Sequence, residues 1–418
     1  MSERYLMSEK YFVINAGSSS VKFKLFEMPT KEVISSGTVE RIGKEGCCWT
    51  IKTQDKKING KGELKNHVDA VNVILKTLLV EDVISDINEI KGVGHRVLHG
   101  ADIYKDSVVI DEGVLANLEK LTPFGPLHMP GAIAVIKCMQ EILPDVMHIA
   151  AFDTAFHQTM PKENYMYSVP YEWYEKYGVR RYGFHGKSHQ YITERMKEVF
   201  FKEDVNIISC HIGSGASIAA IKNGKSIDTS MGLTPLDGLM MGTRSGSIDP
   251  SIIEFMKRRT DMKVAEINAE LNEKSGLYGI AGKNDYRDIE EAAKNGDEKA
   301  QLAITMFIKK VVEFISDYYF ALDGDVDGIV FTAGIGENSA SFRKAVIDKI
   351  KGATGIILNE QANEEIAGFK EKHAGVISAK GSKTNVYVIP TNEELMILND
   401  TYRIIKNIER AKVMTKTR

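Results

Sequence analysis

The stretch Tyr11–Phe26, which reads YFVINAGSSSVKFKLF, is the part of the chain around which we expect the rest to be organised. Its first four residues form a continuous apolar run, which is typical of a buried strand. From Val21 to Leu25 apolar residues alternate with lysines, the pattern of a strand with one buried face. The turn Asn15–Ser20 is built of small residues and hydroxyls with several backbone N–H groups, so it can approach an anion closely. Lys22 could reach the same anion, and the alternative is an ordinary polar hairpin turn.

The same arrangement recurs in the second half of the chain. A strand at Asn206–Cys210 leads into the turn His211–Gly215, which reads HIGSG, and a second strand follows at Ala216–Ile221. Two copies of one strand–turn–strand unit indicate a duplicated domain with one phosphate-binding hairpin in each half. A cleft between the halves is then expected to hold a polyphosphate.

Length and composition set the class of protein. The chain has 418 residues, of which 43% are hydrophobic and 27% charged, values that are ordinary for a globular protein of two or three domains. A net charge of −3 indicates no nucleic-acid-binding face. No apolar run approaches the length of a membrane span, and the polar N-terminus lacks the apolar core of a signal peptide, so we expect a cytoplasmic protein. The spacing of the cysteines indicates neither a zinc site nor a disulfide framework; they are Cys47, Cys48, Cys138 and Cys210.

Strands and helices are mixed along the whole length, which predicts an α/β protein. The predicted helices include His67–Val80, Asp111–Leu121, Pro130–Leu143, Gly186–Phe200, Glu298–Leu322 and Asn392–Arg410. The predicted strands include Ile90–Leu98, His148–Phe152, Gly328–Thr332 and Val386–Ile389. No low-complexity linker marks a boundary. We place it at Asp153, so that residues 1–152 with 393–418 form one domain and residues 153–392 the other.

Three short motifs do not have the context that their usual functions require. Gly186–Ser188 reads like the end of a P-loop, but the required glycine is replaced by Arg181. His185 and His189 have the spacing of a zinc-protease helix without its glutamate. Gly334–Gly336 lacks the third glycine of a dinucleotide-binding fingerprint. We therefore exclude all three functions.

Six motifs in a fixed order resemble those of the acetate kinases. They are Asn15–Lys22, Gly94–Arg96, Arg180–Gly186, Gly242–Gly246, Phe331–Asn338 and Pro390–Glu394, and the resemblance runs from about Tyr11 to about Asp400. It implies duplicated ribonuclease-H-like (actin-like ATPase) domains flanking a central cleft. It also implies a reversible Mg²⁺-dependent transfer of a phosphoryl group from ATP to acetate, giving acetyl phosphate and ADP.

The resemblance assigns catalytic roles to Arg96, Asp153, His185 and Arg244. Charge on a transferring phosphoryl group is best stabilised by rigid cations, and arginine matches phosphate geometry. Mg²⁺, with Mn²⁺ as an alternative, would be held by Asn15, Asp153 and Glu393, which offer the hard oxygen ligands that such ions prefer. A carboxylate substrate is already ionised at neutral pH, so no general base is needed.

The resemblance also implies the residues that bind the substrates. The nucleotide and its phosphates would contact Asn15, Ser18, Ser20, Lys22, His211, Gly213, Ser214, Gly215, Asp285, Tyr286, Arg287, Gly334, Ile335, Gly336 and Asn338. In this interpretation Tyr286 offers an aromatic face to the adenosine, and the small Gly334 favours ATP over pyrophosphate. The acyl pocket would be formed by Arg96, Leu98, Leu127, Phe184 and Pro235. Leu98 stands where valine is usual, and its extra methylene should make the pocket smaller and favour acetate.

Four positions depart from the family pattern, and two other functions stay open. The departures are Met129, Lys187, Ser214 and Ser247; Ser214 could weaken nucleotide binding, and Lys187 could contact a phosphate or simply be solvated. The alternatives are a kinase for propionate or other short-chain acids and a nucleotide-dependent binding module on the same fold. The resemblance further implies a homodimer, with no nucleic-acid or membrane partner.

Overall fold

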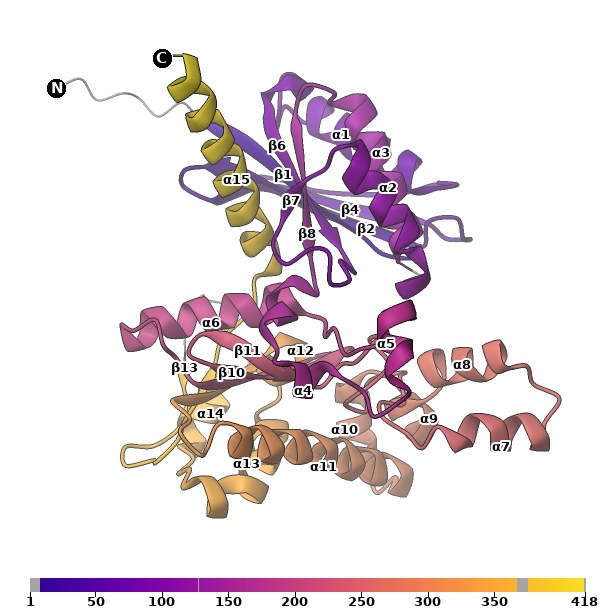
Figure 1. Cartoon of the computed structure of the whole chain (residues 1–418), viewed down its shortest axis with the longest axis vertical. Coiled ribbons are helices and arrows are strands. Elements are labelled where there is room, and N and C mark those ends of the chain that lie inside the picture. The colour runs from indigo at the N-terminus through magenta and orange to yellow at the C-terminus, as the bar shows by residue number, and fades with distance from the viewer. Residues whose placement is uncertain (1–7, 127, 367–374, 417–418) are drawn as a thin grey trace. The chain divides into compact units, whose positions relative to one another are not determined.

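The computed structural model describes residues 8–126, 128–366 and 375–416 (Figure 1). The chain divides into two compact units. The first unit contains residues 1–155 together with 392–418, and the second contains residues 156–391. Each unit is built around one mixed sheet and is described below by itself.

The sheet of the first unit has the strand order β5-β4-β3-β2-β1-β6-β8-β7 within the described residues. Its strands are β1 (Glu9–Ala16), β2 (Ser20–Met28), β3 (Glu32–Glu40), β4 (Cys48–Thr53), β5 (Lys57–Lys61), β6 (Ile90–Val97), β7 (Val108–Val109) and β8 (Met147–Phe152). Strands β1 to β5 form an antiparallel meander, while β6 lies parallel to both β1 and β8. The predicted hairpin of β1 and β2 is therefore at the centre of the sheet.

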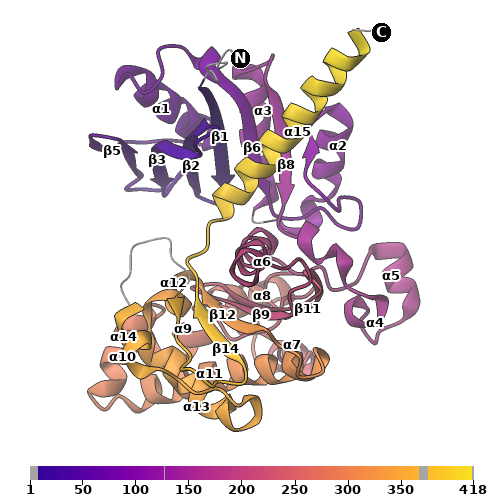
Figure 2. The same ribbon diagram turned by 90° about the vertical axis from the view of Figure 1, so that its left-hand side faces the viewer.

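Both faces of this sheet are covered, which explains the uninterrupted apolar run in β1. Phe12 and Ile14 point into a core formed with α1 (His67–Val80) and α3 (Met129–Ile142). Tyr11 and Val13 point to the opposite face and pack against α15 (Glu393–Lys416), which crosses β6 and β8 in Figure 2. The remaining helical segments of this unit are η1 (Ile87–Glu89), α2 (Glu112–Lys120) and η2 (Thr122–Phe124).

Two glycines of β6 allow α15 to lie directly on the sheet. A Cβ atom at Gly92 would come within 2.4 Å of Ile405, and one at Gly94 within 2.5 Å of Thr401 and 2.7 Å of Ile397. Real Cβ atoms do not approach other atoms so closely, so a side chain at either position would force its neighbours to shift. The helix that begins at Glu393 is held in place by this close contact.

The sheet of the second unit repeats the core of the first. Its strands are β9 (Ile207–Ile212), β10 (Ala216–Lys222), β11 (Lys225–Thr229), β12 (Gly328–Thr332), β13 (Gly375–Val376) and β14 (Asn385–Val388), in the order β11-β10-β9-β12-β14-β13 within the described chain. The series β11-β10-β9-β12-β14 has the same directions as β3-β2-β1-β6-β8: two antiparallel steps followed by two parallel ones. The predicted α/β fold with a duplicated unit is confirmed.

Helices cover both faces of the second sheet as well. In Figure 1, α6 (Gly186–Phe200) lies on one face, and α11 (Glu298–Ala321) and α13 (Ala340–Thr354) lie on the other. The other helical segments are η3 (Ala155–Thr159), α4 (Lys162–Tyr165), α5 (Tyr171–Tyr177), α7 (Ser251–Arg259), α8 (Val264–Glu273), α9 (Gly276–Ala281), α10 (Tyr286–Lys294), α12 (Ala333–Asn338) and α14 (Glu360–Ile366). Of the predicted helices, His67–Val80 and Gly186–Phe200 have the bounds that the sequence indicated.

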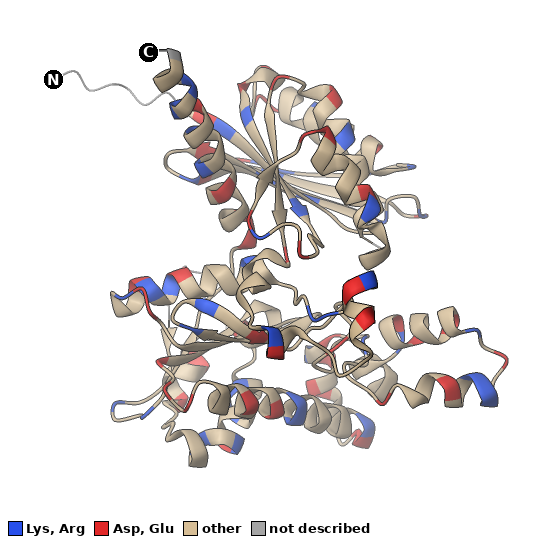
Figure 3. Ribbon diagram, viewed as in Figure 1, with Lys and Arg blue, Asp and Glu red and all other residues tan. Residues whose placement is uncertain are grey.

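Charged residues of both signs are interspersed on the outer helices (Figure 3). Along α11 and α13 they form ion pairs one turn apart, such as Lys309 with Glu313 and Lys344 with Asp348. In the part of the chain that the structure describes, no helix combines the length and apolar character needed to cross a membrane.

We predict that Gly94→Ala destabilises the protein by about 1–3 kcal/mol, because the added methyl overpacks the contact between β6 and α15. Gly62→Ala in the same unit is the matched control, since its Cβ would meet the Trp49 ring at an ordinary 3.4 Å. Differential scanning calorimetry of both variants measures the effect. Equal melting temperatures for the two variants would contradict the prediction.

Candidate functional site

Arg96 lies in an oxygen-rich cluster at the carboxyl ends of β6 and β8 in the first unit. Its Nε donates to Oδ1 of Asp153 at 2.9 Å, and its Nη2 donates to the other oxygen of the same carboxylate. Nη1 donates to Oδ1 of Asn15 at 3.3 Å, and Glu393 Oε2 lies 3.8 Å from Nε. Burial disfavours the charged guanidinium, but Asp153 and Glu393 outweigh burial and raise the pKa of Arg96. The cation is therefore fixed in place and permanently charged.

Two carboxylates lie beside the guanidinium of Arg96 at the centre of the cluster. Asp153 is fully buried, and Glu393, the first residue of α15, is partly buried beside it. Burial raises the pKa of Glu393 to about 7, with Asp153 adding to the rise and Arg96 opposing it. Glu394 has its own partner, Lys24, at 3.2 Å. Two carboxylates thus share one guanidinium, an arrangement that favours a further cation.

The β1–β2 hairpin contributes to the same cluster. Asn15 and Lys22 are directly paired across the ladder, and the charge of Lys22 acts to lower the pKa of Glu393. The turn is closed by Gly17 N–H, which donates to Ser20 O at 2.8 Å, while Gly17 O lies 2.7 Å from Nε2 of His67 at the start of α1. Ser18 is exposed at the tip. The structure therefore brings together the sequence-predicted residues Asn15, Lys22, Arg96, Asp153 and Glu393 in the first unit.

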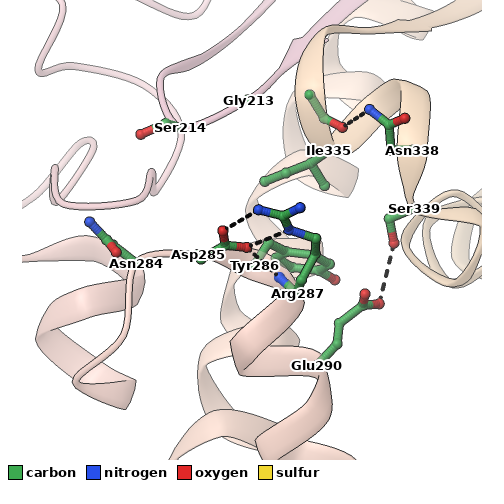
Figure 4. Close-up of a pocket in the computed structure, with 11 residues that line it drawn as sticks. Gly213, Ser214, Asn284, Asp285, Tyr286, Arg287, Glu290, Ile335, Asn338 and Ser339 are labelled. Atoms are coloured by element: carbon green, nitrogen blue, oxygen red, sulfur yellow. Dashed lines mark hydrogen bonds and ion pairs between the residues drawn. The ribbon is translucent and has the colours of Figure 1, made fainter. Parts of the chain in front are cut away.

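In the second unit, a cavity of about 510 Å³ contains most of the predicted nucleotide-binding residues. It is lined by Gly213, Ser214, Asn284, Asp285, Tyr286, Arg287, Glu290, Gly334, Ile335, Asn338 and Ser339 (Figure 4). These residues come from the β9–β10 turn, the start of α10, the helix α12 and the N-cap of α13. No atom lies within 4 Å of the place that a Cβ at Gly334 would take, so this glycine leaves that part of the cavity open.

The short helix α12 is braced at both ends. Oε1 of Glu337 accepts hydrogen bonds from the backbone N–H groups of Ala333 at 2.7 Å and Thr391 at 3.0 Å. The fully buried Arg343 donates through Nη1 to the carbonyl oxygens of Gly336 at 3.0 Å and Glu337 at 2.9 Å. These hydrogen bonds tie the helix that carries Gly334 to the neighbouring segments within the unit.

Asp285, Tyr286 and Arg287 have separate structural roles. Asp285 caps α10 through the Arg287 N–H, and the guanidinium of Arg287 donates to the same carboxylate, which lowers the pKa of Asp285 to about 2. The Tyr286 ring is 5% exposed, and its centroid lies 5.8 Å from that of Phe307 and 5.9 Å from that of Phe342. Most of the ring belongs to the core, so Tyr286 offers the cavity much less aromatic surface than we expected.

Three residues that line the cavity lie outside the predicted motifs: Asn284, Glu290 and Ser339. Glu290 lies one helical turn after Tyr286 on α10, and its Oε1 accepts a hydrogen bond from Ser339 Oγ at 3.2 Å. The i, i+4 spacing from Tyr286 places Glu290 on the same face of the helix, so the sequence contains a signal for this residue. Asn284 and Ser339 directly adjoin predicted residues and could have been found by extending each motif by one position.

His185 and Arg244 converge beside Gly215. A Cβ atom at Gly215 would lie 3.5 Å from Nη1 of Arg244 and 3.6 Å from Nε2 of His185. His185 is at the N-cap of α6 with φ of 56°, and its ring stacks on that of His211 with centroids 4.1 Å apart. The space that the missing side chain of Gly215 leaves is thus bordered by a guanidinium and an imidazole.

Arg244 differs from Arg96 in its electrostatic surroundings. Its Nη1 donates to Pro235 O at 3.2 Å, and among the described residues no carboxylate pairs with it. Burial lowers its pKa. A partly buried guanidinium without a counter-charge is suited to an anionic ligand.

The predicted acyl-pocket residues are divided between the two units. Leu98 follows β6 in the first unit and lies against Gly125, where a Cβ would come within 2.7 Å of its Cδ2. Phe184, which is buried, and Pro235 belong to the second unit. Leu127 lies outside the described residues.

The four departures from the family pattern have distinct environments. Met129 is buried in α3, and Ser214 lines the cavity. Lys187 is 2% exposed and donates to Gln190 Oε1 at 3.2 Å, so the interpretation of a solvated lysine is wrong. Ser247 Oγ donates to Asp237 Oδ1 at 2.6 Å and accepts from Gly238 N at 2.9 Å, which ties it to its own loop.

Comparison with known proteins relates the chain to one group of enzymes. Residues 10–399 match the model of the acetokinase family. The chain is 47% identical over 404 residues to an acetate kinase of Exiguobacterium sp., a match that covers 96% of this chain and 99% of that protein. The crystal structure of Porphyromonas gingivalis acetate kinase has a TM-score of 0.88 and 42% identity, with 95% and 100% coverage. A propionate kinase from Francisella tularensis subsp. tularensis has a TM-score of 0.88 and 41% identity, with 94% and 99% coverage.

Proposed function

Since the chain belongs to the acetokinase family and is an acetate kinase, we propose that it uses the two residue clusters described above to transfer the γ-phosphoryl group of ATP to acetate with the aid of Mg²⁺. The observation that carries this proposal is the position of the β9–β10 turn, which lines the cavity at one end and borders Arg244 and His185 at the other. Gly213 and Ser214 line the cavity, and Gly215 borders Arg244 and His185. A nucleotide bound in the cavity with its phosphates along this turn would direct its terminal phosphate toward that pair.

In this proposal Arg244 and His185 stabilise the transferring phosphoryl group. Charge in phosphoryl transfer is spread over the equatorial oxygens, and catalysis consists mainly of positioning and electrostatic stabilisation. Arg244 supplies a cation that no carboxylate of the described chain neutralises, and His185 supplies a nearby ring nitrogen. Both are buried or partly buried, so their hydrogen bonds act in a medium of low polarity, where they are stronger than in water.

Arg96 is the second proposed cation. Asp153 occupies its Nε and Nη2 donors, which fixes the plane of the guanidinium, and Nη1 is directed toward Asn15. We expect Arg96 to hold the acceptor carboxylate or an oxygen of the transferring group. The acceptor is already an anion at neutral pH, so the residues need to orient it but not to deprotonate it.

The residues of the first unit fit a magnesium ion by the chemistry of their donor atoms. Asn15, Asp153 and Glu393 supply an amide oxygen and two carboxylates, and Mg²⁺ binds few protein oxygens while retaining several waters. Among the described residues, no group of three or more His, Cys, Asp or Glu side chains is placed to hold a metal ion. When bound, the ion would neutralise charge on the phosphates. Asp153 and Glu393 would orient its waters, and Arg96 would keep Asp153 in place.

The kinase relatives support an enzyme over the alternative of a nucleotide-dependent binding module. Partly buried cations at Arg244 and Arg96 support the same choice, because a module that only binds nucleotide does not need them. The implied homodimer and the cytoplasmic location stay predictions.

We predict that Gly215→Ala lowers kcat/KM by about 100-fold, the effect of losing one transition-state donor, because the methyl group would occupy the space between Arg244 and His185. Both neighbours are at ordinary contact distance from the new atom, so the fold should be kept. Acetyl phosphate formation, trapped as the hydroxamate, measures the rate. Gly352→Ala on α13, where a Cβ meets nothing within 4 Å, is the control. A Gly215→Ala enzyme with wild-type kcat/KM would remove this space from the phosphoryl-transfer site.

A second prediction concerns the cavity. Gly334→Leu should fill the open space beside α12 and weaken ADP binding by at least about tenfold, since displaced ligand contacts of roughly 1.4 kcal/mol suffice for that change. Isothermal titration calorimetry with ADP measures the affinity, and Gly352→Leu is the matched control. If Gly334→Leu binds ADP as the wild type does, the cavity is not the nucleotide site.

A third prediction concerns the choice between acetate and propionate. It is needed because one relative is described as a propionate kinase. We propose that acetate is preferred and that Leu98 restricts the pocket. Leu98→Ala should raise the propionate/acetate ratio of kcat/KM about fourfold, because burying one methylene contributes about 0.8 kcal/mol. Leu64→Ala, a partly buried position in the same unit, controls for lost packing. An unchanged ratio in a folded Leu98→Ala enzyme would exclude Leu98 from the pocket.

A further inference from the structure

A chain of alternating serine and histidine side chains runs through the interior of the second unit to His185. Ser209 Oγ lies 2.8 Å from Nδ1 of His189, and Nε2 of His189 lies 2.8 Å from Oγ of Ser217. Ser217 Oγ then lies 2.9 Å from Nδ1 of His185. Ser209, Ser217 and His189 have no exposed surface, so water does not compete for these contacts.

The hydrogen-bonding capacity of Ser217 couples the two histidines. Its hydroxyl has one proton, so it can donate to only one of the two rings and must accept from the other. If His189 carries its proton on Nε2 and donates to Ser217, then Ser217 donates to Nδ1 of His185, and the proton of neutral His185 is on Nε2. The reverse arrangement puts protons on Nδ1 of both rings and leaves Nε2 of His185 as an acceptor.

The position of His185 distinguishes the two arrangements. Its Nε2 faces the space at Gly215 that Arg244 also borders. An anion in that space is best held by donors from both residues, and of the two arrangements with a neutral His185 only the first supplies a donor from Nε2. His189 stays neutral in this setting, because burial, with His157 and His211 nearby, holds its pKa well below the ordinary range. Neutral His189 carries one ring proton, so it can donate to only one of its two serine partners and keeps the relay in a single arrangement.

We propose that His189, acting through Ser217, is a positioning residue that holds neutral His185 in the tautomer with its proton on Nε2, directed at the transferring phosphoryl group. This rests on the proposed role of His185 in the reaction. The relay also fixes the orientation of the ring, since Nδ1 of His185 is tied to β10 while its neighbour His211 stacks against one face. His189 thereby acts on the reaction without contacting the substrate.

The test uses the full chain labelled with ¹⁵N-histidine and long-range ¹H–¹⁵N NMR, which distinguishes the two tautomers of each neutral ring. Signals are assigned from their loss in His185→Gln and His189→Gln. We expect Nε2–H tautomers for both His185 and His189 in the wild type. An Nδ1–H tautomer at His185 would overturn the proposal whatever the activity of the enzyme.

Kinetics provide the second readout. Ser217→Ala should lower kcat about tenfold, the effect of one net hydrogen bond, with KM values for ATP and acetate within about twofold of the wild type. Ser217→Thr, which keeps the hydroxyl, should restore most of the rate. An unchanged kcat in Ser217→Ala would overturn the proposal.

Further variants distinguish an effect transmitted through the relay from a general loss of packing or stability. Ser226 makes a comparable contact with another buried histidine, Nδ1 of His157 at 2.8 Å, outside the relay, so Ser226→Ala should leave the His185 tautomer and kcat unchanged. His189→Gln can still donate to Ser217 through its amide and should be more active than His189→Leu; equal rates for these two would also count against the relay. If His185→Gln itself keeps the wild-type kcat, the proposed function of His185 fails, whereas the tautomer measurement still decides the relay.

Discussion

The ion pair between Arg96 and the fully buried Asp153 is the interaction on which the geometry of the first unit's cluster depends. A carboxylate with no exposed surface is tolerated because two guanidinium donors pair with it, and removing either partner would leave an uncompensated buried charge. The pair joins the ends of β6 and β8, and Arg96 also contacts Asn15 from β1 and approaches Glu393 from α15. One guanidinium thus joins four segments of the chain, namely β6, the end of β8, β1 and the start of α15.

The two proposed catalytic arginines show two ways of keeping a cation in a protein interior. Arg96 is neutralised by the chain itself and is therefore a fixed element of the structure. Arg244 has a carbonyl oxygen and a thioether sulfur as its partners, and burial acts against its charge. Its desolvation is offset only when an anion arrives, so part of the binding energy of such a ligand comes from relieving an unfavourable state of the free protein.

The fold could be predicted from the sequence because its signals are local. The uninterrupted apolar run in β1 indicated a strand buried on both faces, and α15 and the α1–α3 layer provide those two faces. The site residues could be listed from ordered motifs, but their contacts depend on residues far apart in the chain. The ring of Tyr286 is turned into the core by Phe307 and Phe342, and no local pattern indicates those partners. The burial of Lys187 likewise results from packing between elements, which a sequence read in order does not contain.

The contact of α15 with β6 has a consequence for how the protein is made. The second unit, residues 156–391, is continuous in the chain and can complete its core as soon as it has been synthesised. The first unit cannot, because the face of its sheet that carries Tyr11 and Val13 packs against α15, with Ile397, Leu398 and Ile405 among its contacts, and α15 follows the second unit in the chain. During translation this apolar face stays uncovered while more than two hundred residues of the second unit are added. The sheet of the first unit, which is synthesised before the second unit, is therefore the part most exposed to misassociation on the ribosome.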